Sequence, residues 1–132
     1  MIMMENNKWP ADYPVDIELP PEDAEHMNLP LYRFVNKENP DLSDFLASYK
    51  DPEQKHLLYK NKNNPHFYAT SFFNDLDKIS AIADGNPEKF SKKIISKGDV
   101  KHKHGKCSIN NKSGHVSVWL FESIFPEGFK SI

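Results

Sequence analysis

The chain has 132 residues, of which 38% are hydrophobic and 27% charged, and its net charge is −2. This length predicts one domain whose core needs no disulfide or metal to fold, and the single cysteine, Cys107, excludes an intrachain disulfide. The longest apolar run is only Val118 to Phe121, which excludes a membrane-spanning helix. We therefore expect a reduced, cytoplasmic protein.

Residues 1–30 are predicted to form a proline-rich acidic arm that packs on a domain of residues 31–132. Five prolines in this segment forbid a long helix. The alternation of Val15, Ile17 and Leu19 favours a short edge strand or a packed arm. Residues 1–31 carry seven acids against one lysine, whereas residues 89–112 carry eight lysines against one acid. Such a split predicts either an anionic partner or an acidic arm lying on its own basic face.

Hydrophobic spacing predicts an α+β fold for residues 31–132. Alternation indicates strands near 31–35, 66–72, 99–104, 106–110 and 115–121. Helical spacing indicates helices near 41–49, 74–84 and 87–97, with Asp41, Asn74 and Asn86 as their caps. We expect a mostly antiparallel five-stranded sheet with about three helices on one face, its last three strands forming a meander. The predicted core comprises Phe34, Phe45, Leu46, Phe67, Leu76, Ile79, Ile94, Val116, Val118 and Leu120.

The last predicted strand has two different faces. Val116, Val118 and Leu120 form an aliphatic face that is expected to meet helices. His115, Ser117, Trp119 and Phe121 form the other, which is either buried or the floor of a ligand pocket. The candidate pocket residues are Arg33, Thr70, Ser71, His115, Ser117 and Trp119.

Three histidines are the metal-ligand candidates. His102 and His104 would point the same way along a strand, with His115 on a neighbouring strand. Lysines at 101, 103 and 106 oppose a cation there, so a solvated basic hairpin is the alternative. No cofactor motif is present, and Cys107 reads as a small buried side chain.

Arg33, Thr70-Ser71 and Glu122 follow one another in an order that resembles ADP-ribosyltransferase-like domains. The resemblance implies that Arg33 binds dinucleotide phosphates, that Ser71 supports the pocket and that Glu122 holds a ribose. Arginine is a natural fork for phosphate, and a carboxylate stabilises a developing oxocarbenium ion. The alternative is an Arg33 paired with an acid and a Glu122 in solvent.

The lysines of the segment Lys89–Lys112 predict either a surface that contacts the phosphates of a nucleic acid or a basic face exposed to solvent. Its one aromatic residue, Phe90, is assigned to the core. The segment therefore offers no exposed aromatic ring on which the bases of a single-stranded nucleic acid could stack.

The pattern LYRxV…DFxxS…TSFF…HVxVW resembles one found in short uncharacterised bacterial proteins. This resemblance implies a single bacterial or phage-borne domain and no particular chemistry. The first hypothesis is therefore a binding or interaction module, in a defence, toxin–antitoxin or phage setting, for a protein partner or an anionic ligand. A small nucleotide-using enzyme or toxin is the alternative, and nucleic-acid binding through Lys89–Lys112 is the second.

Overall fold

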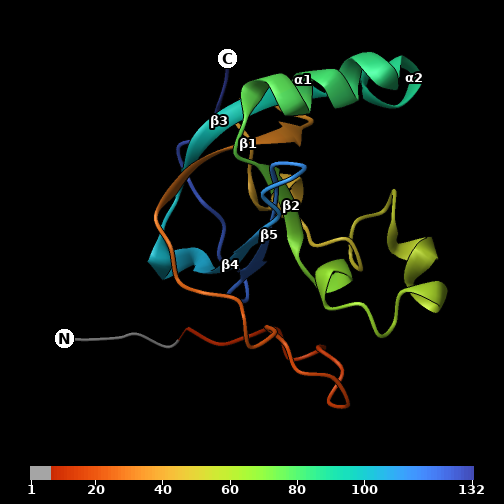
Figure 1. Cartoon of the computed structure of the whole chain (residues 1–132), viewed down its shortest axis with the longest axis vertical. Coiled ribbons are helices and arrows are strands. Elements are labelled where there is room, and N and C mark those ends of the chain that lie inside the picture. The colour runs from red at the N-terminus through yellow and green to blue at the C-terminus, as the bar shows by residue number, and fades with distance from the viewer. Residues whose placement is uncertain (1–6) are drawn as a thin grey trace.

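Six antiparallel strands form one open sheet in the computed structural model, which describes residues 7–132 (Figure 1). Their order across the sheet is β4-β5-β2-β1-β3-β6. Their bounds are β1 Leu29–Val35, β2 Thr70–Phe73, β3 Ile94–Val100, β4 Gly105–Ile109, β5 His115–Leu120 and β6 Lys130–Ser131. The α+β class and the antiparallel sheet are confirmed, with β6 as a strand that the sequence did not predict.

Two α-helices lie together at one end of the sheet, α1 (Leu76–Gly85) and α2 (Pro87–Phe90) (Figure 1). The carboxylate of Asp75 caps α1 by accepting from the Lys78 N–H, so the cap lies one residue beyond the predicted Asn74. Four short 3₁₀ helices connect the strands: η1 Leu42–Phe45, η2 Lys55–Lys60, η3 Pro65–Tyr68 and η4 His102–His104. In the described part of the chain, no helix is long and apolar enough to cross a membrane.

The predicted helix at 87–97 is wrong beyond Phe90. Residues 94–100 form β3, which pairs with β1 from Leu29 opposite Val100 to Val35 opposite Ile94. Ile94 and Ile95 are β-branched and favour strands. They therefore pair with β1, although the local spacing of apolar residues fits a helix. The predicted meander is wrong for the same reason, because β3 joins β1 on the far side of the sheet from β4.

Three other predicted elements are shorter or different. The strand at 99–104 ends at Val100, because the Lys101 N–H donates to Nδ1 of His104 across the turn η4. The helix at 41–49 is only the turn η1, whose cap Asp41 accepts from the Ser43 N–H. In the region 66–72, η3 precedes β2, because Pro65 follows the capping residue Asn64 and starts a turn.

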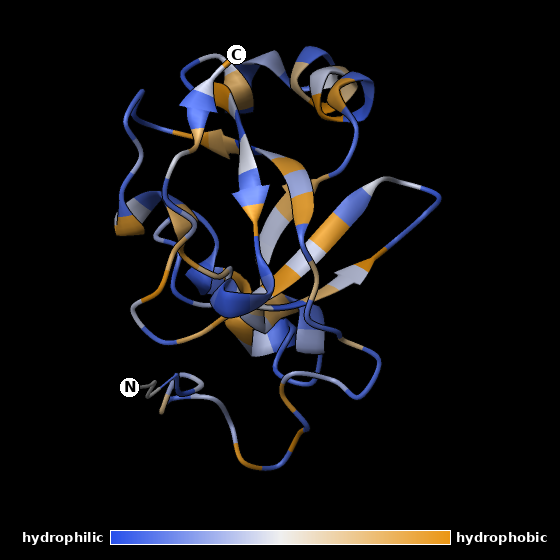
Figure 2. Cartoon of the chain, turned by 90° about the vertical axis from the view of Figure 1, so that its left-hand side faces the viewer, coloured by the Kyte–Doolittle hydropathy of each residue, from blue (hydrophilic) through white to orange (hydrophobic). Residues whose placement is uncertain are grey.

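The aliphatic face of the sheet packs against aromatic side chains and not against the α-helices. Phe45 from η1 and Phe129 near the C-terminus form a core with Phe72, Val116 and Val118 on this face. The opposite face carries Phe34 and Phe73 and receives Phe90 of α2, which stacks on Phe34 at 4.2 Å. Figure 2 shows the resulting alternation of apolar and polar residues along the strands.

Half of the predicted core is buried: Phe45, Phe67, Ile79, Val116 and Val118. Leu76 is 37% exposed, which corrects its assignment, since it begins α1 at the surface. The remaining four residues, Phe34, Leu46, Ile94 and Leu120, are half-buried.

The acidic arm contacts the domain chiefly through aromatic side chains. Trp9 stacks on Phe121 with ring centroids 4.4 Å apart, and the Asp12 carboxylate accepts from the Tyr49 hydroxyl at 2.7 Å. Residues 15–19 form no strand, and the backbone of Glu25 instead makes an isolated bridge to Cys107. The arm therefore covers the end of the sheet at which β5 finishes.

Gly98→Ala is expected to destabilise the fold by about 1–3 kcal/mol, because overpacking forces neighbours apart. A Cβ at this position of β3 would overlap the ring of Phe129, which packs directly over the glycine. Gly85→Ala is the matched control, since nothing lies within 4 Å of its Cβ position. Urea denaturation of both variants measures the difference, and equal midpoints would contradict the packing of Phe129 on β3.

Candidate functional site

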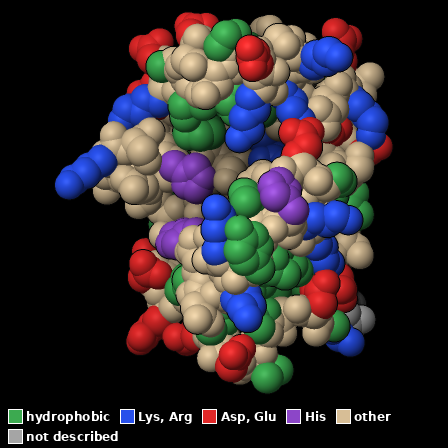
Figure 3. Space-filling model, turned by 90° about the vertical axis from the view of Figure 1, so that its right-hand side faces the viewer, with side chains coloured by type: hydrophobic (Ala, Val, Ile, Leu, Met, Phe, Trp, Pro, Cys, Tyr) green, Lys and Arg blue, Asp and Glu red, His purple; other side chains and the backbone are tan. Residues whose placement is uncertain are grey.

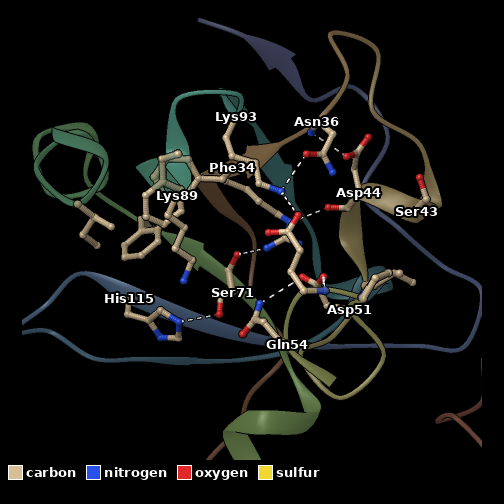
Figure 4. A pocket seen from close by; sticks show the side chains of 17 residues that line it. Phe34, Asn36, Ser43, Asp44, Asp51, Gln54, Ser71, Lys89, Lys93 and His115 are labelled. Carbon is tan, nitrogen blue, oxygen red and sulfur yellow. Dashed lines mark hydrogen bonds and ion pairs between the residues drawn. The ribbon is translucent and has the colours of Figure 1, made fainter. Parts of the chain in front are cut away.

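A cleft of about 450 Å³ opens beside the point where β1 and β2 separate. The two strands are in register at one position only, Tyr32 opposite Phe73. Side chains from β1, β2, β5, α1, α2 and the segment between β1 and η2 line it (Figure 4). Its apolar wall consists of Phe34, Leu46, Pro52, Phe73, Ile82 and Phe90. The volume lies in the range of small-molecule sites.

Arg33 lies at the base of this cleft and bridges the separated strands. Its Nε donates to the Asp44 carbonyl at 2.8 Å and its Nη1 to the Ser71 carbonyl at 2.6 Å. The guanidinium also lies over the rings of Phe45 and Phe72, at 5.8 and 5.6 Å from their centroids. Burial lowers the pKa of Arg33 to about 10, and the charges of Asp51 and Asp44 oppose this shift. The side chain therefore stays charged at neutral pH.

Each carboxylate of the cleft has at least one close partner. Asp44 Oδ1 accepts from the Asn36 N–H at 2.8 Å, and Asp51 Oδ1 accepts from the Glu53 N–H at 2.8 Å. Glu53 forms an ion pair with Lys93 at 2.7 Å. One oxygen of each acid is thus held by a backbone N–H or by a lysine, whereas Asp44 Oδ2 is buried and has no hydrogen-bond partner among the described residues.

Two cations of the cleft lack such a partner. Among residues 7–132, neither Arg33 nor Lys89 has a carboxylate oxygen within 4 Å. Lys89 lies over the ring of Phe90, 5.3 Å from its centroid, and its side chain extends toward Ser71 and His115 (Figure 4). The alternative of an ion pair between Arg33 and an acid is therefore not formed among these residues, since Arg33 donates to the backbone carbonyl of Asp44 and not to its carboxylate.

Ser71 and His115 contribute a hydrogen-bonded pair to the same cleft. His115 Nε2 lies 3.0 Å from Ser71 Oγ, and both side chains are half-buried. They come from neighbouring strands, where His115 is opposite Phe73 and Ser71 opposite Ser117. Burial and the nearby His66 lower the pKa of His115, so its imidazole is neutral at neutral pH.

The polar face of β5 divides between the Arg33 cleft, the interior and a separate open cleft that Ser117 lines with His66. Trp119 is fully buried and donates from Nε1 to the Pro65 carbonyl at 3.0 Å, and Ser117 is 1% exposed and bonded to Nδ1 of His66. Thr70 points to the opposite face and donates to the Phe45 carbonyl. Of the six candidate pocket residues, the cleft therefore brings together Arg33, Ser71 and His115.

Glu122 lies apart from Arg33 and Ser71. It is exposed at a second cleft, lined by the arm and by residues 42–50, and its backbone N–H donates to the Lys8 carbonyl. Glu122 is not among the residues that line the Arg33 cleft. The constellation that the ADP-ribosyltransferase resemblance requires is not formed.

The three candidate metal-ligand histidines have separate environments. His102 lies beside Asn28, with Nδ1 3.2 Å from its amide oxygen, while His104 is buried and accepts from the Lys101 N–H. His115 faces Ser71. In residues 7–132, no group of three or more His, Cys, Asp or Glu side chains could hold a metal ion.

Some cleft residues have no signal in the sequence. Phe73 comes from β2, Phe90 from α2 and Lys93 from the connection between α2 and β3. Asp44 is buried because η1 turns its side chain back to the end of β1. Histidine, lysine and acidic side chains border a hollow on this face of the molecule (Figure 3). Two lysines of the Lys89–Lys112 segment, Lys89 and Lys93, belong to the cleft. Comparison of the chain with family models, with curated proteins and with solved structures found no match.

Proposed function

We propose that the protein is a binding module for a small organic anion with an apolar, planar body. The observation that carries this proposal is the half-buried Arg33 guanidinium at the base of an aromatic-walled cleft, with no carboxylate in contact. Two backbone carbonyls fix its orientation and leave the remaining N–H groups of its fork for a ligand. A carboxylate or phosphate is the complement of that fork.

The distribution of charge supports an anion rather than a cation. Asp44 and Asp51 accept from backbone N–H groups, and Glu53 is neutralised by Lys93. Arg33 and Lys89 thus carry the charges without a close partner. A half-buried charge without a counter-ion favours a ligand that brings one.

The apolar wall supports a planar body for the ligand. Phe34, Phe73 and Phe90 lie on the same side of the cleft, with Phe34 between the other two rings. Aromatic faces and edges are available to a flat ligand there. An inorganic ion would leave this wall in contact with water.

Benzoate and phenyl phosphate are expected to bind about 10–100-fold more tightly than benzamide, since a charge-assisted hydrogen bond contributes about 1.5–3 kcal/mol. Two-dimensional NMR of the full chain measures this, because the moving amide signals also locate the ligand. We expect shifts at Arg33, Ser71 and His115. Equal affinity for benzamide, or shifts confined to other parts of the chain, would refute an anion site in this cleft.

The affinity for benzoate is expected to rise about fivefold to tenfold as the pH falls from about 7.5 to about 5. The pKa of His115 lies below its ordinary value of 6.5 in the free protein, so acid adds a positive charge to the cleft. That charge joins Arg33, Lys89 and Lys93, faces Asp44, Asp51 and Glu53, and has His66 as its neighbour. NMR titrations of wild type and His115→Gln at both pH values test this. An unchanged pH dependence in His115→Gln would assign the effect to another group.

A further inference from the structure

Ser71 and His115 form the one serine–histidine pair in the Arg33 cleft. Nε2 of His115 lies 3.0 Å from Ser71 Oγ, within reach for a proton transfer (Figure 4). The His115 ring is held edge-on against Phe73 with centroids 5.4 Å apart, and its backbone N–H donates to the Ser113 hydroxyl. A serine beside a fixed, neutral imidazole has the arrangement of an activated nucleophile.

The surroundings suit a reaction that develops negative charge. Arg33 Nη1 donates to the backbone carbonyl of Ser71, so the guanidinium lies beside the backbone of the serine and lines the same cleft. Lys89 extends toward the same place (Figure 4). Positive groups that are already in position when the reaction begins stabilise an oxyanion as it forms.

We propose that Ser71 is the nucleophile and His115 the base of an acyl-transfer site that hydrolyses small esters carrying an anionic group. Ser71 Oγ bonds to the ester carbonyl carbon while its proton passes to His115 Nε2. Collapse of this adduct expels the alcohol, which takes the proton, and leaves an acyl-serine. Water then attacks the acyl group and gives a proton to His115. The Ser71 oxygen leaves with that proton and the acid is released.

The inference rests on the proposed function only for the anionic group of the substrate, which Arg33 would hold. The reactivity of the serine rests on the Ser71–His115 geometry by itself. The two parts can therefore fail separately.

Ser117 is a matched internal control. Its hydroxyl also lies beside a histidine, with His66 Nδ1 at 2.9 Å, and it is directly opposite Ser71 in the sheet. However, Ser117 is 1% exposed and is not part of the Arg33 cleft. Ser117 lines a separate open cleft with His66, but Ser117 itself is almost fully buried whereas Ser71 is half-buried, and this difference in exposure distinguishes the two serines.

A fluorophosphonate probe tests the nucleophile directly, because the serine oxygen displaces fluoride and its proton passes to the histidine. With the full chain, peptide mass spectrometry should place the label on Ser71 and not on Ser117. Ser71→Ala should lose the label, and His115→Gln should be labelled about 100-fold more slowly. The wild-type rate should rise with pH and level off above the His115 pKa. No label on Ser71, or an equal rate in His115→Gln, would overturn the proposal.

Ester hydrolysis separates this inference from the binding proposal. The para-nitrophenyl half-ester of succinic acid should be hydrolysed at least about tenfold faster, as kcat/KM, than neutral para-nitrophenyl butyrate. Ser71→Ala should abolish hydrolysis. Benzoate binding without any label on Ser71 would reject the nucleophile alone. A labelled Ser71 with no preference for the anionic ester would reject the role of Arg33 and retain the nucleophile.

Discussion

Trp119→Ala should lower the free energy of unfolding by about 3–5 kcal/mol, as large-to-small changes of buried aromatic residues do. Trp119 is fully buried near the centre of a cluster with Tyr68, Ala69 and Ala24. Its removal also leaves the Pro65 carbonyl without the indole N–H that it accepts at 3.0 Å. Since small domains are stable by only about 5–15 kcal/mol, a large part of the stability would be lost.

Trp9→Ala is the matched control for this prediction. Trp9 is half-buried and stacks on Phe121 at the surface, so its loss should cost about 1 kcal/mol. Urea denaturation followed by circular dichroism compares both variants without depending on tryptophan fluorescence. Similar midpoints for the two variants would contradict the central position of Trp119.

Arg33→Met should have two effects, a loss of about 2–4 kcal/mol of stability and a loss of benzoate binding of at least about tenfold. The methionine retains an apolar stem near Phe45 and Phe72 but donates nothing to the carbonyls of Asp44 and Ser71. An unsatisfied buried acceptor costs about 1–3 kcal/mol. Without a donor between them, the separated ends of β1 and β2 lose their bridge.

Lys89→Met is the control, because it removes a positive charge from the same cleft without disturbing a backbone carbonyl. Lys89 is exposed, so its stability should change by less than about 0.5 kcal/mol. Urea denaturation measures the stability of the two variants and NMR titration measures their affinity for benzoate, so the two effects can be separated. An Arg33→Met variant as stable as wild type would show that the guanidinium does not hold the strands. A stable variant that still binds benzoate would refute the anion site.

The local sequence predicted secondary structure correctly where the apolar residues of one helix or strand all lie on one face. Residues 115–120 and 76–85 each follow the period of their own secondary structure, so β5 and α1 were predicted within a few residues. The hairpin of β4 and β5 follows from the turn residues between them. The same alternation correctly separated the aliphatic face of β5 from its polar face.

Local spacing failed where pairing partners are distant in sequence. Ile94 and Ile95 fit a helix locally. The seven residues of β1 offer β3 a complete strand partner, although the paired residues lie 59–71 positions apart in the sequence. The cleft has the same origin, since Arg33, Ser71 and His115 meet only because β1 and β5 both neighbour β2. No spacing within one segment encodes that order.

For the strand at residues 115–120, the sequence by itself determined which side chains share a face, because the pleat alternates at every residue. It could not determine which of them are accessible. Tertiary structure seals Trp119 beneath η3 and leaves His115 beside the opening between β1 and β2, where Arg33 replaces part of the strand pairing. Access depends on what covers each position, and those covering segments come from distant parts of the chain.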